Sequence, residues 1–296
     1  MPSADFRIAH SSLARRTLDN LQTNLARLAR AQDEVSSMKR LRRPSDSPVD
    51  TVSAMRLRAD MGRNTQIARN LDDALGWLGV ADNALTSTVE QLTRIRDLVI
   101  QARNVSSDAP AREGIANEVE KIRETVLGLA NTQYNGRAIF AGTASGVAAY
   151  DGNGNYVGFS AAIERTIAPG VRVQVNVNGD DAFGTPGDDL FTHIADLAAA
   201  IRSNPGDLDA LATELDARTR SLQARLAEVG ARYMRVEAMK DRNSADALTM
   251  KQNLSNVEDT DMAHAVMELQ MQEVAYQAAL QATARAIQPS LVDFLR

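Results

Sequence analysis

The stretch LDDALGWLGVADNALTSTVEQLTRIRDLVIQARNV, residues 71–105, carries the pattern that decides the fold. Leucines recur in it at steps of seven residues, and the same column extends back to about residue 49. Such a column lies on one face of an α-helix and is typical of helices that pack as coiled coils. We therefore predict one long helix from about Val49 to about Val105, whose column is Leu57, Asn64, Leu71, Leu78, Leu85, Leu92 and Val99.

A second column is expected to share the buried face of this helix. Its polar members are interpreted as positions that set the register or reach solvent, and not as chemical groups. A helix of roughly 50 residues is about 75 Å long at 1.5 Å per residue. The sequence therefore predicts a mainly α fold built as an elongated antiparallel helical rod. The second column is Ala54, Met61, Ala68, Leu75, Asp82, Val89 and Arg96.

The C-terminal half supplies a partner for this helix. Another sevenfold column begins at Leu208, after an Asn-Pro-Gly-Asp turn signal, and reaches Val257. The two long helices are expected to run antiparallel, since the segment between them is long enough to return the chain. The predicted rod core is Leu57, Leu71, Leu78, Leu85, Leu92 and Val99 with Leu215, Leu222, Val229 and Val236.

Between the helical segments, residues 138–187 have a different character. Gly and Asn are dense there, and four valines from Val171 to Val177 alternate with polar residues. Strict alternation predicts a half-buried strand, with a partner strand around Arg165. We expect a small β-rich insert at the tip of the helical hairpin.

The two ends of the chain have complementary character. Each carries an apolar stripe at helical spacing, after a lead of about ten residues that we expect to be flexible. Residues 1–43 hold nine Lys and Arg against four Asp and Glu, whereas residues 257–296 hold two against six. We predict that the ends pair, either within one chain or between copies. The predicted assembly interface is Leu18, Leu21, Leu25, Leu28, Val266, Leu269, Tyr276, Leu280, Ile287, Leu291, Phe294 and Leu295.

Two hinges separate the ends from the long helices. The first contains Pro44, Ser45, Asp46 and Pro48, which break one helix and start the next. The second is the segment from Ser255 to Asp261. The predicted organisation is therefore three-part: residues 1–43 with 257–296 as paired terminal helices, 44–137 with 188–256 as the rod, and 138–187 as the insert.

Composition narrows the classes of function. A formal net charge of −5 argues against nucleic acid as a partner. The chain has no cysteine, no signal-peptide pattern and no apolar run of transmembrane length, so we expect no membrane partner. No motif of a hydrolase, a phosphate loop or a metal site is present, and the three histidines lie in unrelated segments. We expect no enzyme activity, no catalytic residue, no metal and no cofactor.

Four stretches carry a resemblance to a known family. RRPSDSPVDTVSAMRLR (42–58) and LTRIRDLVIQARN (92–104) are similar to segments of the flagellin superfamily of bacterial axial proteins. YNGRAIFAGT (134–143) and QPSLVDFLR (288–296) look like the branch of that family that joins hook to filament. The resemblance covers essentially the whole chain and is loosest in the β insert.

The resemblance implies a structural subunit of the flagellum, exported through the flagellar type III apparatus and transiently cytoplasmic before export. Its implied partners are copies of itself in a ring, the adjacent hook-associated protein, flagellin, and a cytoplasmic chaperone that holds the C-terminal helix. One alternative is the filament subunit itself. Others are a helical adaptor rod that is not exported, and an enzyme housed in the insert, although so small a sheet makes a poor pocket.

Overall fold

The structure is a computed structural model that describes residues 3–104, 109–144, 148–203 and 205–287. The chain divides into two compact units. We call Met1–Gly62 with Leu248–Arg296 the terminal unit, and Arg63–Ala247 the central unit. Two long helices, α2 (Pro48–Asn104) and α6 (Leu208–Glu258), each contribute to both units.

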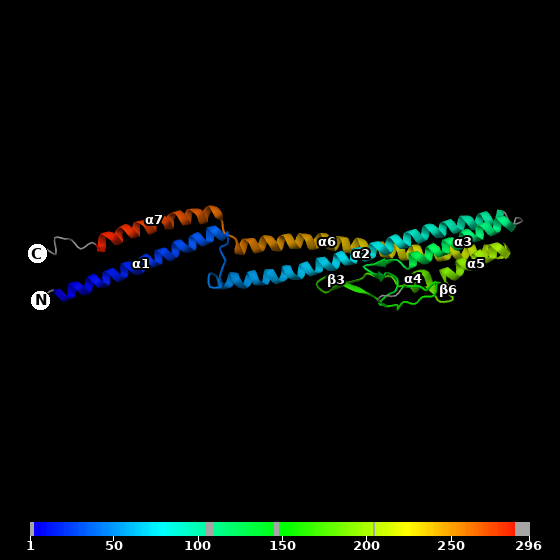
Figure 1. Cartoon of the computed structure of the whole chain (residues 1–296), viewed down its shortest axis with the longest axis horizontal. Coiled ribbons are helices and arrows are strands. Elements are labelled where there is room, and N and C mark those ends of the chain that lie inside the picture. The colour runs from blue at the N-terminus through cyan, green and yellow to red at the C-terminus, as the bar shows by residue number, and fades with distance from the viewer. Residues whose placement is uncertain (1–2, 105–108, 145–147, 204, 288–296) are drawn as a thin grey trace. The chain divides into compact units, whose positions relative to one another are not determined.

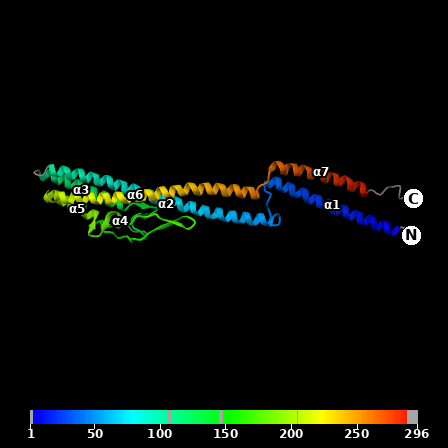
Figure 2. The same ribbon diagram turned by 180° about the vertical axis from the view of Figure 1, so that it is seen from behind.

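In the terminal unit, α1 (Ser3–Ser37) and α7 (Met262–Ile287) lie side by side and antiparallel. Figures 1 and 2 show this pair from opposite sides. The expectation of a flexible lead is wrong for residues 3–10, because α1 begins at Ser3. Neither Gly nor Pro interrupts that segment in the sequence.

The predicted first hinge is the turn between α1 and α2. The Asp46 carboxylate accepts the main-chain N–H groups of Arg42 and Arg43, at 3.2 and 2.7 Å. Ser47 caps α2 by accepting the N–H of Asp50 at 3.3 Å, and Pro48 is the first helical residue, where its missing N–H costs nothing. Pro44 and Ser45 are exposed in the turn. The hinge chemistry thus follows from the residue types in sequence.

In the central unit, α2 and α6 bury the leucine and valine columns. Leu71, Leu78, Leu85, Leu92 and Val99 are at most 1% exposed, as are Leu215, Leu222, Val229 and Val236. Leu57 is half-buried. The helices α3 (Ala109–Ala130) and α5 (Leu190–Ser203) pack on each other, and the short 3-10 helix η1 (Pro205–Asp207) leads into α6.

The predicted second column of α2 is buried only in part: Ala54 is 3% exposed, whereas Leu75 and Val89 are half-buried against the core. Beside the leucines the helix buries Ala74, Ala81, Thr88, Ile95 and Ala102, one position before the predicted series. Arg96 is correspondingly exposed, and its guanidinium forms an ion pair with Asp216 at 3.3 Å. Most of these buried residues are Ala or Thr, which fit where neighbouring segments pack closely against α2. Their small, weakly hydrophobic side chains do not mark them as buried in the sequence.

In and beside the insert, the described residues form three two-stranded antiparallel sheets. In β1 (Gln133–Tyr134) and β2 (Arg137–Ala138), Asn135 and Gly136 form the turn with φ of 50° and 75°. The pair β3 (Glu164–Ala168) and β4 (Val171–Gln174) places Arg165 opposite Val173. Then follow α4 (Gly179–Phe183), β5 (Gly184–Thr185) and β6 (Asp188–Asp189).

The strands lie back along α2 and α6 instead of extending beyond them. Arg165 forms an ion pair with Asp73 at 2.7 Å, and the Asn70 amide donates to the Thr166 carbonyl at 3.0 Å. Arg232 of α6 donates to the Asn176 carbonyl at 3.2 Å. The prediction of a mainly α fold with a small β insert is confirmed. The three-part domain division stays a prediction.

Candidate functional site: the paired terminal helices

The seam between α1 and α7 is formed by their least exposed residues. These recur at alternating steps of four and three, which is coiled-coil spacing. Seven of the twelve are Ala, Asn, Gln or Thr, so the seam buries little apolar surface. The α1 residues are Thr17, Leu21, Asn24, Leu28, Ala31 and Val35, and the α7 residues are Ala265, Leu269, Gln272, Tyr276, Ala279 and Thr283.

The predicted interface residues divide into two groups. Leu21, Leu28, Leu269 and Tyr276 are half-buried in the seam. The others that the structure describes are exposed: Leu18 and Leu25 by 49% each, Val266 by 38% and Leu280 by 42%. The side chain of Ile287, and all of Leu291, Phe294 and Leu295, lie outside the described residues.

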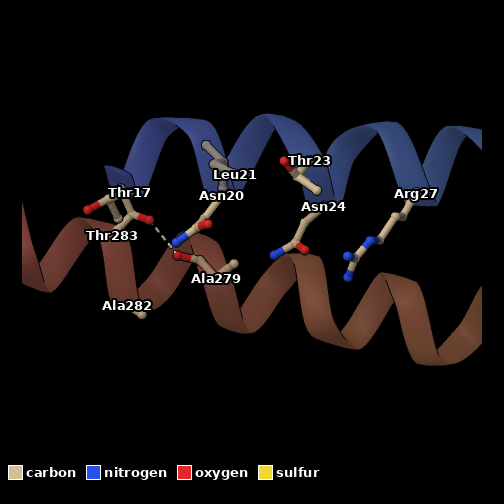
Figure 3. A pocket seen from close by; sticks show the side chains of 9 residues that line it. All are labelled: Thr17, Asn20, Leu21, Thr23, Asn24, Arg27, Ala279, Ala282 and Thr283. Carbon is tan, nitrogen blue, oxygen red and sulfur yellow. Dashed lines mark hydrogen bonds between the residues drawn. The ribbon is translucent and has the colours of Figure 1, made fainter. Parts of the chain in front are cut away.

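A polar groove of about 360 Å³ follows one side of the seam. Asn20, Asn24 and Arg27 of α1 line it together with Ala282 and Thr283 of α7, and Figure 3 shows both asparagine amides directed at α7. Among the described residues, these two amides and the Arg27 guanidinium have no hydrogen-bond partner. This side of the pair therefore presents unsatisfied polar groups.

The opposite side of the seam is apolar. At about 100° per residue, Leu18 and Leu25 lie on the flank of α1 away from Asn20 and Arg27. By the same geometry, Val266 and Leu280 lie on the flank of α7 away from Ala282. The four exposed members of the predicted interface thus share one side of the helix pair.

Exposed apolar residues concentrate in the terminal unit as a whole. Of the seventeen large hydrophobic residues that are exposed in the described part of the chain, thirteen belong to this unit, although it is the smaller one. Monomeric proteins rarely expose so many neighbouring apolar side chains without a partner. The thirteen are Leu18, Leu25, Met38, Val49, Val52, Met55, Leu248, Met262, Val266, Met267, Met271, Val274 and Leu280.

Several ion pairs of the terminal unit lie at or next to the hinge. The Glu258 side chain is 4% exposed and forms ion pairs with Lys39 at 3.0 Å and Arg58 at 2.7 Å. Its main-chain carbonyl accepts the N–H groups of Arg40 and Leu41, at 2.8 and 3.2 Å. Glu258 therefore joins the end of α6, the first hinge and α2. Sequence reasoning missed this residue, because its partners lie about 200 positions away.

Two opposing effects act on the Glu258 carboxyl group. Burial raises its pKa, but the interactions with Lys39 and Arg58 outweigh burial and hold the pKa below its usual range. The group is therefore ionised near neutral pH. Along the helices themselves, Arg15, Arg16, Arg27 and Arg30 form no ion pair with any residue that the structure describes. These four arginines of α1 are therefore available, within the described part of the chain, to charges outside it.

The described ranges contain neither a cluster of metal ligands nor a helix that could cross a membrane. Within them no cluster of three or more metal-ligating side chains occurs. No helix there combines the length and apolarity needed to cross a membrane. His193 is buried, with its Nε2 atom 2.9 Å from the Leu211 carbonyl, and desolvation lowers its pKa.

The sequence matches two family descriptions. Residues 8–145 match the bacterial flagellin N-terminal helical region, and residues 212–295 match the bacterial flagellin C-terminal helical region. Together the matches span about three quarters of the chain and include both halves of the helix pair.

Individual relatives cover nearly the full length. The chain is 25% identical to a flagellin of Bacillus subtilis (strain 168), over 95% of this chain and 96% of the relative. It is 24% identical to flagellar hook-associated protein 3 of Escherichia coli (strain K12), over 84% and 87%. Among solved structures, a putative flagellar hook-associated protein from Vibrio parahaemolyticus is similar with a TM-score of 0.66, at 22% identity, over 72% of this chain and 100% of that one. At this identity the structural likeness concerns the fold.

Proposed function

Because this chain belongs to the bacterial flagellin family, we propose that it is a structural subunit of the flagellum that forms the junction between hook and filament. The observation that carries the proposal is the concentration of thirteen exposed large hydrophobic residues in the terminal unit. A subunit with such a surface needs neighbours to cover it. The central unit, by contrast, has a buried core of its own.

Two features favour the junction over the filament. YNGRAIFAGT and QPSLVDFLR resemble the junction branch of the family. Flagellar hook-associated protein 3 of Escherichia coli aligns over most of its length, and so does its counterpart in Salmonella typhimurium, at 23% identity over 94% of that protein. The relationship is remote in each case, so these features support the proposal together.

In the proposed mechanism the central unit is the stably folded part and the terminal unit makes the contacts between subunits. The central unit keeps its fold before and after assembly, since its apolar columns are already buried. The α1–α7 pair is weak alone, because a seam rich in Asn, Thr, Gln and Ala buries little apolar surface. Contacts between copies add the missing burial through the side of the pair that carries Leu18, Leu25, Val266 and Leu280. Assembly thus completes the terminal unit.

The proposed partners follow from this role. They are further copies in a ring, an adjacent hook-associated protein on one side and flagellin on the other. Before export, a cytoplasmic chaperone covers α7, whose exposed Met267, Met271 and Val274 form an apolar stripe suited to a partner's groove. Export through the type III apparatus then places the protein in the flagellum. We propose no enzymatic role.

Removal of residues 1–43 tests the mechanism. The truncated chain lacks α1 and keeps all of the central unit, so we expect a soluble, folded monomer that no longer assembles. In a strain without the native gene it should leave hooks intact while flagellin leaks into the medium. A truncated chain that still joins filaments to hooks would overturn the mechanism.

The filament subunit is a second candidate, favoured by the full-length alignment with the Bacillus subtilis flagellin. Abundance separates the two functions. A filament subunit is the major component of sheared filaments and polymerises alone, whereas a junction subunit is a trace component. Long filaments grown from the purified chain would favour this candidate.

A further inference from the structure

Three Asn-Gly pairs occur in the sequence: Asn135-Gly136, Asn153-Gly154 and Asn178-Gly179. In such a pair the main-chain nitrogen of the glycine can attack the side-chain carbonyl carbon of the asparagine, because glycine has no side chain to shield that nitrogen. The attack needs a glycine N–H that is free of hydrogen bonds and a main chain that can rotate. The folded chain meets both conditions at one of the three pairs.

Asn135 and Gly136 are exposed at the turn between β1 and β2. Among the described residues, neither the Asn135 side chain nor the Gly136 N–H has a hydrogen-bond partner. A Cβ atom at Gly136 would meet nothing within 4 Å, so the main chain there has open space around it. The ladder beside the turn has only two residue pairs, and Asn135 holds a left-handed φ of 50°. Local opening of this turn therefore costs little free energy.

At the second pair, Asn153-Gly154, the attacking nitrogen is already bonded. Gly154 is buried and donates its N–H to the Asp151 carbonyl at 3.1 Å. The Asn153 N–H donates to the Asp151 carboxylate at 2.9 Å, and the Arg123 guanidinium donates to the Asn153 carbonyl at 2.6 Å. These three hydrogen bonds fix the main chain through which the attack would take place.

At the third pair, Asn178-Gly179, both reacting groups are held. Gly179 is buried and donates its N–H to the Phe140 carbonyl at 2.8 Å. The Asn178 amide donates to Asp181 at 3.2 Å, and its Oδ1 atom accepts from the Asn176 amide at 2.9 Å. The surrounding insert would have to open before these groups could meet.

We propose that Asn135 is a site of spontaneous modification, at which the side-chain amide is lost and aspartate and isoaspartate form. The Gly136 nitrogen bonds to the side-chain carbonyl carbon of Asn135. The bond from that carbon to the amide nitrogen breaks, and ammonia leaves with the proton of the Gly136 N–H. Water then opens the resulting succinimide ring at one or the other of its carbonyl groups, which gives aspartate or isoaspartate. The reaction needs only water, and it does not depend on the proposed function.

Isoaspartate lengthens the main chain of the turn by one carbon atom. The turn sets the register of the two strands, so the pairing of Tyr134 with Arg137 cannot be kept. Both residues contact Trp77 of α2: the Tyr134 ring lies edge-on with ring centroids 5.9 Å apart, and the Arg137 guanidinium lies 5.7 Å from the centroid. The modification therefore loosens the β1–β2 hairpin from α2. Trp77 is the single tryptophan of the chain, so its fluorescence reports this change.

Ageing of the purified, folded chain at mildly alkaline pH tests the site. Mass spectrometry of its peptides measures the conversion of each asparagine to the acid, and separation of the two acid forms identifies isoaspartate. Asn135 should convert at least about tenfold faster than Asn153 or Asn178, because only its pair reacts without opening of the insert. In concentrated urea the three rates should agree within about threefold, because no fold protects any pair there. Equal rates at the three pairs in the folded chain would overturn the proposal.

Asn135→Gly is the matched control for the effect on the hairpin, because Gly-Gly forms the same kind of turn without the reactive amide. The Trp77 fluorescence of the native chain should change at the rate at which isoaspartate accumulates. In Asn135→Gly it should stay constant over the same period. Unchanged fluorescence after full conversion of Asn135, or an equal change in Asn135→Gly, would overturn the stated effect on the hairpin.

Discussion

Asn64 of α2 and Asn243 of α6 bind each other reciprocally: each side-chain amide donates to the main-chain carbonyl of the other residue, at 3.3 and 3.4 Å. Both residues stand in sevenfold columns that are otherwise apolar, and Asn64 is only 8% exposed. A polar pair of this kind satisfies itself in one register only, because a shift of seven residues would place an amide against leucine. The pair therefore sets the alignment of the two long helices.

Replacement of Asn64 and Asn243 should show that the pair specifies the helix register and adds little to the free energy of unfolding. Asn64→Ala alone should lower the free energy of unfolding by about 1 kcal/mol, because the hydrogen bond from the Asn64 amide to the Asn243 carbonyl is lost, while the Asn243 amide stays in a partly buried seam. Asn64→Leu with Asn243→Leu should be neutral or stabilising in urea unfolding, since both polar partners are removed. The exposed Asn83→Ala serves as control and should change stability by less than about 0.5 kcal/mol. A double variant less stable than Asn64→Ala would contradict this role.

Glu258 should make the hinge sensitive to acid. Its pKa in the folded chain lies below the usual value, so its stabilising contribution is complete above the ordinary glutamate pKa. That contribution is lost as the pH falls through the lowered pKa, because the protonated carboxyl group no longer attracts Lys39 and Arg58. Glu258→Gln should cost about 1 kcal/mol at pH 7, discounted for the exposure of both cations.

Unfolding by urea at pH 7 and at several values below pH 4.5 measures this dependence. The difference between the native chain and Glu258→Gln should shrink as the pH falls. The control Glu237→Gln, at an exposed position on the same helix, should change stability at pH 7 by less than about 0.5 kcal/mol. A constant difference for Glu258→Gln at every pH would contradict an ionic role.

Much of the fold was predictable because seven-residue columns of large aliphatic residues specify helix, length and buried face together. The predicted helix from Val49 to Val105 agrees closely with Pro48–Asn104. The alternation of valines correctly indicated a strand, although β4 ends at Gln174, before the predicted end at Val177. Beyond Gln174 the Asn176 side chain, and not its main chain, bonds to the neighbouring segment. Its Oδ1 accepts the Ile163 N–H at 2.7 Å, and its amide donates to the Ala161 carbonyl at 2.8 Å.

The second buried column and the hinge were not predictable in the same way. Alanine and threonine fill the close-packed face of α2 as well as leucine would. The hydrophobic pattern therefore did not show that Ala81 is buried in place of Leu75 or Asp82, which the predicted column contained. In α1 the pattern could not say which leucines face α7 and which face outward. Glu258 gave no signal, since it meets Lys39 and Arg58 only after the chain has folded back on itself.

Gly142 should be indispensable to the insert. Its φ of 62° disfavours any side chain, and a Cβ atom there would overlap the main-chain carbonyl oxygen of Phe159. That carbonyl accepts the Thr143 N–H at 3.1 Å, so it is fixed in place. Gly142→Ala should destabilise the chain by about 2 kcal/mol or more in urea unfolding. Gly128→Ala, in the last turn of α3 with open space around it, should instead stabilise by roughly 0.5–1 kcal/mol. Equal effects of the two variants would refute the steric argument.

The leucines of α1 should fall into two functional classes. Leu18 and Leu25 are 49% exposed, so Leu18→Ala with Leu25→Ala removes little buried surface from the monomer. Leu21→Ala with Leu28→Ala makes the same chemical change on the same helix but empties the seam with α7. The seam variant should lose protection of the terminal unit in hydrogen exchange on the free monomer, by roughly tenfold, whereas the outer variant should keep it.

In a strain without the native gene, the outer variant should nevertheless fail to join filaments to hooks. Motility equal to that of the native chain would mean that Leu18 and Leu25 are not part of the contact between subunits.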